Sequence, residues 1–98
     1  MKIYNILANE WMAPPGRVYV VHLAPEITGD DLIIAHRAID GRPAWSVTHV
    51  ETSTSIARGA TRKAAVEHAA WKLQHYGRDV YLKAVQSAAA KLAERQKS

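Results

Sequence analysis

The stretch R-G-A-T-R-K-A-A-V-E-H-A-A-W-K-L-Q-H-Y, residues 58–76, has the pattern of a strand end, a glycine turn and an amphipathic helix. Gly59 permits the chain to reverse, and the Thr61 hydroxyl can accept a hydrogen bond from a free first-turn amide, so Thr61 is a good N-cap. The apolar residues that recur at helical spacing are Ala65, Ala69, Leu73 and Tyr76, with Val66 and Ala70 beside them. We expect a helix at about 62–76.

A second helix should follow directly. Gly77 stands where a C′ residue belongs, and Asp79 can cap a new helix that runs to about residue 95. Its apolar stripe consists of Tyr81, Val85, Ala88 and Leu92.

The residues before the first helix favour a meander of strands. Asp40-Gly41 is a turn signal, because this dipeptide tolerates the positive φ angles of tight turns. In the strand that follows, Trp45 alternates with Ser46, so that Trp45 should lie on the core side. The first strand, R-V-Y-V-V-H-L, reads as buried on both faces or nearly so, and Pro25 should end it. The strands are expected at about 17–24, 32–39, 44–51 and 55–58.

The N-terminal segment is ambiguous. In residues 2–12, Ile3, Ile6, Leu7 and Trp11 fit helical spacing, yet residues 2–7 fit an edge strand equally well. Pro14-Pro15-Gly16 ends either element.

Length and composition limit the fold to one domain, residues 1–98, of the α+β class: an antiparallel sheet with helices at about 62–76 and 79–95 on one face. The chain is 48% apolar and 22% charged, which is typical of globular domains. With no cysteine it has no disulfide and no thiolate metal site. Polar residues interrupt the N-terminus, so we expect neither a signal peptide nor a membrane span, and a cytoplasmic location.

Charge is divided unevenly along the chain. Residues 1–51 carry four Lys/Arg against six Asp/Glu, whereas residues 52–98 carry nine against three. This asymmetry indicates either a basic face that meets an acidic partner or an ordinary solvated helix surface.

The histidines do not form a metal-binding pattern. His22, His36 and His49 fall in three strands, and His68 and His75 lie seven residues apart on the helix. Two helical turns separate such a pair by about 10.5 Å, too far for one ion. We expect no metal site.

No catalytic pattern stands out either. The hydroxyls clustered at residues 52–55 could include a nucleophile, but the neighbouring sequence offers neither a base nor an oxyanion cradle. There is no P-loop and no dinucleotide fingerprint. We therefore expect no enzyme activity, no catalytic residue and no cofactor.

The residues best suited to contact a partner lie on and beside the first helix. Arg62 and Lys63 occupy its first turn, where free amides together with cations can seat a phosphate or carboxylate. Trp71 falls outside the apolar stripe; it is either covered by a terminal segment, the more ordinary outcome, or exposed at an interface. The candidate contact residues are Arg58, Arg62, Lys63, Trp71, Lys72 and Arg78.

The D-G turn, the strand A-W-S-V-T-H-V and the run I-A-R-G-A-T-R-K-A-A-V-E-H-A resemble the core of HicB-type antitoxins, whose fold is a partial version of the double-stranded-RNA-binding domain. The helix start is also similar to that RNA-binding domain, whose helix begins Ser-Lys-Lys-x-Ala-Lys-x-x-Ala-Ala. The positions that match are Thr61, Arg62, Lys63, Ala65, Ala69 and Ala70. Val66 replaces the third basic residue, which removes one phosphate contact. The resemblance covers about residues 32–76 and leaves the strand at 17–23 without a counterpart.

Two functions follow as expectations. The first is a non-catalytic interaction module of bacterial or phage origin, which docks an acidic protein surface as an inhibitor or antitoxin-like regulator, for example of a host defence system. The alternative is a nucleic-acid-binding domain that contacts phosphates through the basic start of the helix at 62–76. No membrane partner is expected, and a homodimer remains open because sheet edges in a small domain need cover.

Overall fold

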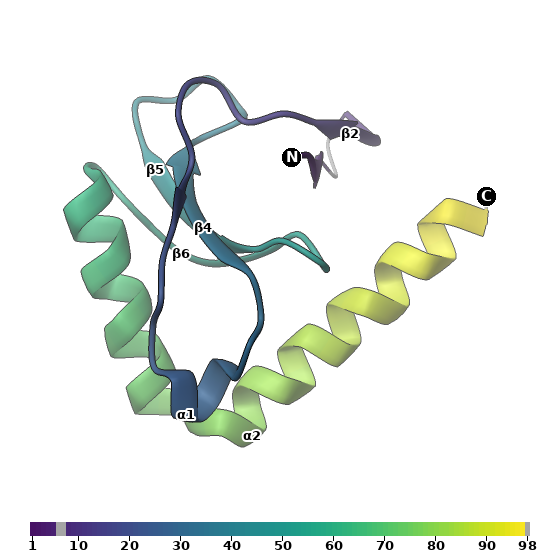
Figure 1. The fold of residues 1–98 in the computed structure, drawn as a ribbon. Helices are drawn as coiled ribbons and strands as arrows, with labels where there is room; N and C mark the ends of the chain where they lie inside the picture. Colours follow the sequence, from purple (N-terminus) through teal and green to yellow (C-terminus); the bar gives the residue numbers. More distant parts are fainter. Residues whose placement is uncertain (6–7, 98) are drawn as a thin grey trace.

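A computed structural model describes residues 1–5 and 8–97. The chain forms a two-stranded sheet, a four-stranded sheet and a long helix bent in the middle (Figure 1). The α+β class and the antiparallel sheet that the sequence predicts are confirmed. The elements are β1 (Ile3–Asn5), β2 (Glu10–Met12), β3 (Tyr19–Val20), α1 (Pro25–Thr28), β4 (Ile33–Arg37), β5 (Trp45–His49), β6 (Thr54–Gly59) and α2 (Arg62–Lys97).

The larger sheet is a meander in the order β3-β4-β5-β6, with every pair antiparallel. Its central strands, β4 and β5, pair from Ile33 opposite His49 to Arg37 opposite Trp45. The turn predicted at Asp40-Gly41 is present between β4 and β5. Gly41 has a φ of 80°, and the Arg42 amide donates to the Asp40 carboxylate at 3.1 Å. Strand β6 is an edge strand, and a bulge interrupts its pairing with β5.

The first strand of this sheet is shorter than the sequence predicts. Only Tyr19 and Val20 form the strand, and Val21 adds one more bond, from its amide to the Ile33 carbonyl at 3.0 Å. Because β3 is an edge strand, Val20 stays 53% exposed, so the expectation of burial on both faces is wrong. Pro25 does not simply end the strand: it opens the short helix α1, where its missing amide costs nothing.

Helix α2 packs its first half against one face of the sheet. The contact consists of small side chains, with Ala65 and Ala69 fully buried against strand residues that include Val47. The predicted cap is present, since the Ala64 amide donates to the Thr61 hydroxyl at 3.1 Å. Gly59 does not have a positive φ; it is needed because a Cβ there would lie 2.5 Å from the Ala65 nitrogen.

Gly77 breaks α2 into the two helices expected from the sequence. Its φ of 79° and ψ of −179° are not helical, and the residues on both sides of it continue in helical form. We call residues 78–95 the arm. Figure 1 shows the arm leaving the bend near α1 and running away from the first half of the helix. A second core cluster fills the bend, where Ile27 of α1 meets Leu73 and Tyr81.

The N-terminal segment is a β-hairpin, which settles the choice between helix and strand. Ile3 pairs with Met12, and Tyr4 with Trp11. Ile6 and Leu7, which also enter the helical pattern, lie outside the described residues. The hairpin is tied to the turn before β6, because the Tyr4 amide donates to the Ser53 hydroxyl at 2.8 Å.

Candidate functional site

Two side chains of α2 bond to the open edge of β6. Lys72 Nζ donates to the Ile56 carbonyl at 3.2 Å, and His68 Nδ1 donates to the Arg58 carbonyl at 3.2 Å. The two carbonyls are two residues apart on an edge strand, where main-chain groups have no neighbouring strand to bond. The helix therefore covers this edge with side chains rather than with main chain.

The outer side of the same helix carries an aromatic surface. Trp71 is 56% exposed, so of the two alternatives left open by the sequence the exposed one holds, and not the more ordinary one of cover by a terminal segment. Its ring stacks on His75 with centroids 4.6 Å apart and planes inclined by 10°, and the centroid of the His68 ring lies 6.5 Å from that of Trp71. Tyr76 extends the surface and is 54% exposed. We call His68, Trp71, Lys72 and His75 the helix flank.

The basic residues at the helix start do not gather into one binding site for a phosphate or carboxylate. The Arg62 guanidinium lies 3.9 Å from the Tyr19 ring centroid, and Lys63 pairs with Glu67 one turn along at 3.9 Å. Arg58 pairs with Asp40 at 3.3 Å. The structure thus gives each of these three predicted contact residues a partner within the chain.

Arg78 has a structural role. Its guanidinium donates to the Ile27 carbonyl at 3.1 Å and to the Glu26 carbonyl at 3.3 Å. These carbonyls belong to α1, so Arg78 fastens that short helix to the bend of α2. Of the six predicted contact residues, Trp71 is the apolar one, and its ring, 56% exposed, contacts His68 and His75.

A groove runs between β6 and the arm. It consists of two hollows of about 210 and 500 Å³ that share Thr54, Ser55 and Ala84. Arm residues Ala88 and Leu92 line the larger hollow. Its cationic lining residues are Lys72 in the smaller hollow and Lys91 and Arg95 in the larger one. We call this space the edge groove.

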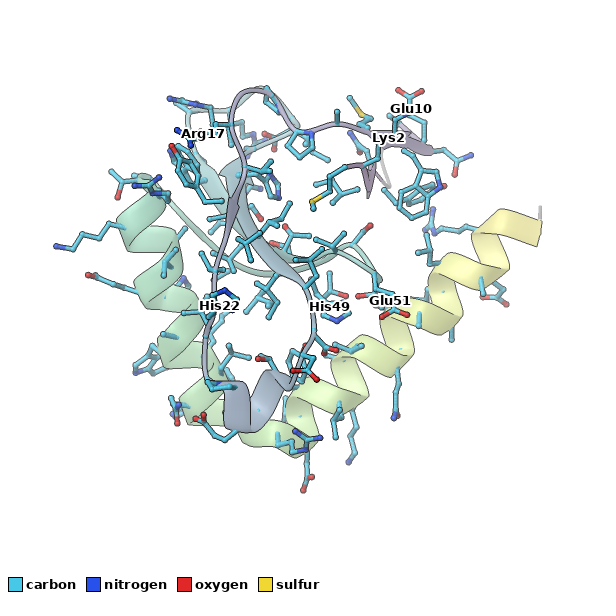
Figure 2. The ribbon with its side chains drawn as sticks, viewed as in Figure 1. Lys2, Glu10, Arg17, His22, His49 and Glu51 are labelled. Carbon is cyan, nitrogen blue, oxygen red and sulfur yellow. The ribbon has the colours of Figure 1, made fainter. Side chains whose placement is uncertain are left out.

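Sequence reasoning missed a chain of polar contacts inside the bend. His49 Nε2 lies 3.2 Å from the Asp31 carboxylate, and its Nδ1 lies 2.8 Å from the Thr52 hydroxyl. Figure 2 shows His49 within the angle between the two halves of α2. Tyr81 of the arm also donates to Asp31, and burial, followed by this bond, raises the pKa of Tyr81. His49 therefore is a base beside the hydroxyls at 52–55, contrary to the expectation that none is near. The carboxylate that orients it, Asp31, lies far away along the chain and could not be connected to it from the sequence.

This carboxylate–imidazole–hydroxyl line lacks the other parts of a nucleophilic site. Thr52 is buried, and its hydroxyl also bonds to Thr54 at 2.6 Å. The nearby amides are engaged: Thr52 N donates to His49 Nδ1 at 3.4 Å, and Ser53 N to the Val50 carbonyl at 3.3 Å. Neither amide is left to stabilise an oxyanion. The line ties the turn before β6 to the arm.

A second buried network lies on the sheet face opposite α2. His36 Nδ1 donates to the Arg37 carbonyl at 2.7 Å, so in the neutral ring Nε2 accepts from the Thr48 hydroxyl, also at 2.7 Å. Ser46 continues the chain to Thr48 at 3.2 Å and to Ser55 at 3.0 Å. Burial lowers the pKa of His36, and the nearby Arg58 charge lowers it further against the opposing effect of the Arg37 carbonyl.

Within the described residues, no group of three or more metal-ligating side chains comes together, and no helix is long and apolar enough to cross a membrane. No protein-family model, curated protein or solved structure matches this chain. Inferences about its function therefore rest on its own residues.

Proposed function

We propose that this chain is a non-catalytic interaction module that docks a protein partner with an acidic surface. The observation that carries the proposal is the exposed stack of Trp71 on His75. An exposed Trp buries much apolar area when a partner covers it, and Trp is enriched among the residues that dominate binding energy. Polar and basic side chains around such a residue form the rim that typical interfaces have.

The charge of the chain supports an acidic partner. Residues 52–98 carry nine Lys/Arg against three Asp/Glu, and those in the described part of α2 lie on or near its exposed sides. Opposite charge on the partner speeds association and disfavours wrong partners. The further step, that docking inhibits or regulates the partner in the cytoplasm of a bacterium as an antitoxin does, rests on the resemblance of residues 32–76 alone.

Nucleic acid is the competing partner class. Trp71 and His75 could stack on unpaired bases, but Arg58 and Arg78 already bond within the chain. Phosphate binding would require those side chains to give up these bonds. We therefore favour a protein partner, and the test below includes nucleic-acid binding as a result that would contradict the proposal.

The test compares three baits, wild type, Trp71→Ala and Trp11→Ala, in affinity purification from bacterial lysate with and without phage infection. Trp11 is a matched control because it is also exposed but belongs to β2. We expect a protein that wild type and Trp11→Ala retain. With that protein purified, Trp71→Ala should weaken binding about 30-fold or more, as for an interface hot spot.

Two results would contradict the proposal. One is undiminished capture by Trp71→Ala. The other is binding to duplex RNA or DNA, measured by fluorescence anisotropy, that falls steeply with salt and is lost in the double variant Arg62→Glu/Lys63→Glu, since salt dependence of that kind reports phosphate contacts.

A further inference from the structure

We infer that the docked partner binds as an added β-strand: an extended acidic segment pairs with the open edge of β6 and displaces Lys72 and His68 from the Ile56 and Arg58 carbonyls. This inference rests on the proposed function and specifies the mode of docking and the chemistry of the segment. It is carried by the edge position of β6, by the two side-chain bonds on its outward carbonyls and by the charged groove beside it.

Both carbonyls are accessible to donors from outside the sheet. Ile56 and Arg58 are alternate residues of β6, and Ile56 is the extra residue at the bulge opposite Val47 and Thr48. Both carbonyls accept from side chains of α2, and alternate amides of an extended peptide likewise point to one side. Main-chain donors on a neighbouring strand can therefore replace the two side-chain donors one for one.

The present bonds are suited to exchange. Both are 3.2 Å long, at the long end of the range for N–H···O bonds. The His68 bond is exposed to solvent. Lysine regains rotamer freedom when its ammonium is released, and water or a carboxylate of the incoming segment can solvate it. The Lys72 and His68 side chains thus cover the edge of β6 but can be displaced from it.

The edge groove would contact the side chains of the added strand. An added strand on β6 would have one face toward the groove, where Ala84, Ala88 and Leu92 accept apolar side chains. Lys72 and Lys91 line the same space and favour carboxylates. A segment that alternates β-branched apolar residues with acidic residues places its apolar side chains on the face toward the groove, because successive side chains of a strand point to opposite faces. The net negative charge of such a segment is favoured by the lysines beside the groove.

Charge argues for a separate acidic partner rather than a second copy of this chain. Pairing of β6 with the β6 of another copy would bring the cations of one edge groove toward those of the other. Like charges opposed across an interface are unfavourable. A homodimer through this edge is therefore an outcome that would overturn the inference.

The test uses the full ¹⁵N-labelled chain and a capped hexapeptide of three Val-Glu repeats. Two further probes are the same peptide N-methylated on alternate residues and a peptide of three Val-Lys repeats. We expect the acidic peptide to shift the amide resonances of β6, Thr54–Gly59, with cross-strand contacts to Ile56 and Arg58. N-methylation keeps the charge but removes the donors, so it should weaken binding about tenfold. The Val-Lys peptide should not bind.

One pair of variants tests whether His68 blocks the edge of β6 or itself contacts the bound peptide. His68→Ala frees the Arg58 carbonyl and should bind the acidic peptide several-fold more tightly. His75→Ala is the matched control, because His75 lies on the same helix flank and its ring contacts are with Trp71 and Tyr76 rather than with β6. Weaker binding by His68→Ala would mean that the imidazole is itself a contact, which contradicts displacement.

Four other outcomes overturn the inference: no shift in β6 at millimolar peptide, equal binding of the N-methylated peptide, equal binding of the Val-Lys peptide, or a concentration-dependent dimer that protects β6 amides. None of these measurements involves Trp71. If a partner requires Trp71 while the peptide leaves β6 unperturbed, the proposed docking function stands and strand addition is wrong. If β6 binds the peptide but no partner requires Trp71, strand addition stands and the proposed docking through Trp71 is wrong.

Discussion

A Cβ placed on Gly59 would lie 2.5 Å from the main-chain nitrogen of Ala65 and 2.9 Å from the carbonyl carbon of Ala64. The end of β6 therefore passes so close to the first turn of α2 that only glycine fits. This contact fixes where the helix leaves the sheet, and with it the distance from which Lys72 and His68 reach the strand edge.

We expect Gly59→Ala to destabilise the chain by about 2–3 kcal/mol, because the obstructing atoms are main chain and cannot rotate away. Urea denaturation monitored by circular dichroism measures the change. Gly29→Ala is the comparison: nothing lies within 4 Å of its Cβ, so its cost comes only from a φ of 59°. A Gly59 variant as stable as wild type would mean that the helix start shifts freely.

Thr61→Ala should cost about 1 kcal/mol, since the Ala64 amide loses its acceptor at the helix N-terminus. Thr61→Ser keeps the acceptor and should remain near wild type. Thr61→Asp keeps it and adds a charge that favours this end of the helix. Equal loss in all three variants, measured by thermal unfolding, would assign the effect to the threonine methyl group rather than to the cap.

Trp71→Ala should change the free energy of unfolding by no more than about 0.5 kcal/mol, as expected for an exposed site. Val47→Ala, on the fully buried face of the sheet, should cost about 2 kcal/mol by contrast. Chemical denaturation of both variants gives the comparison. A large loss for Trp71→Ala would mean that the aromatic stack supports the fold, and the docking test would then need a milder change at that position.

His36 should make stability depend on pH. Its folded pKa lies below the ordinary value of 6.5, so as pH falls the unfolded chain takes up this proton before the folded chain does. The stabilisation from the neutral ring is complete above about pH 7 and is lost progressively below it, with a slope of at most about 1.4 kcal/mol per pH unit.

The measurement is the difference in unfolding free energy between wild type and His36→Gln from pH 7.5 to 5. Taking the difference cancels the groups that both proteins share. Wild type should lose more stability across this range. The lowered carboxyl pKa values of Glu26 and Asp40 act at more acidic pH, since their ordinary values are 4.5 and 3.8. Parallel curves for the two proteins would show that His36 takes up its proton equally in both states.

Local patterns in the sequence predicted the elements that depend on local chemistry. The Thr61 cap, the break at Gly77 and the opposite directions of Val47 and Ser46 all follow from backbone preferences and side-chain periodicity. The hairpin of β1 and β2 could not be chosen over a helix, because three-residue strands are too short to show a period.

The candidate functional surface is harder to predict from the sequence. Lys72 was recognised as a cation, but its bond to Ile56 depends on how far the helix is offset from the strand, which no spacing along the chain encodes. Asp31 and His49 meet through strand register, and register is set by long-range pairing. Trp71 was correctly singled out as lying off the apolar stripe, but whether another segment covered it depended on where the termini lie.

The covered edge of β6 also bears on the tendency of this chain to aggregate. A six-residue open strand edge is a template on which further strands can polymerise, and cells tolerate few of them. Lys72 and His68 obstruct that growth while leaving the carbonyls within reach of a suitable segment. Resistance to aggregation and the proposed capture of a partner thus depend on the same two bonds. A substitution that removes one of these bonds to strengthen binding should therefore also make concentrated protein aggregate sooner.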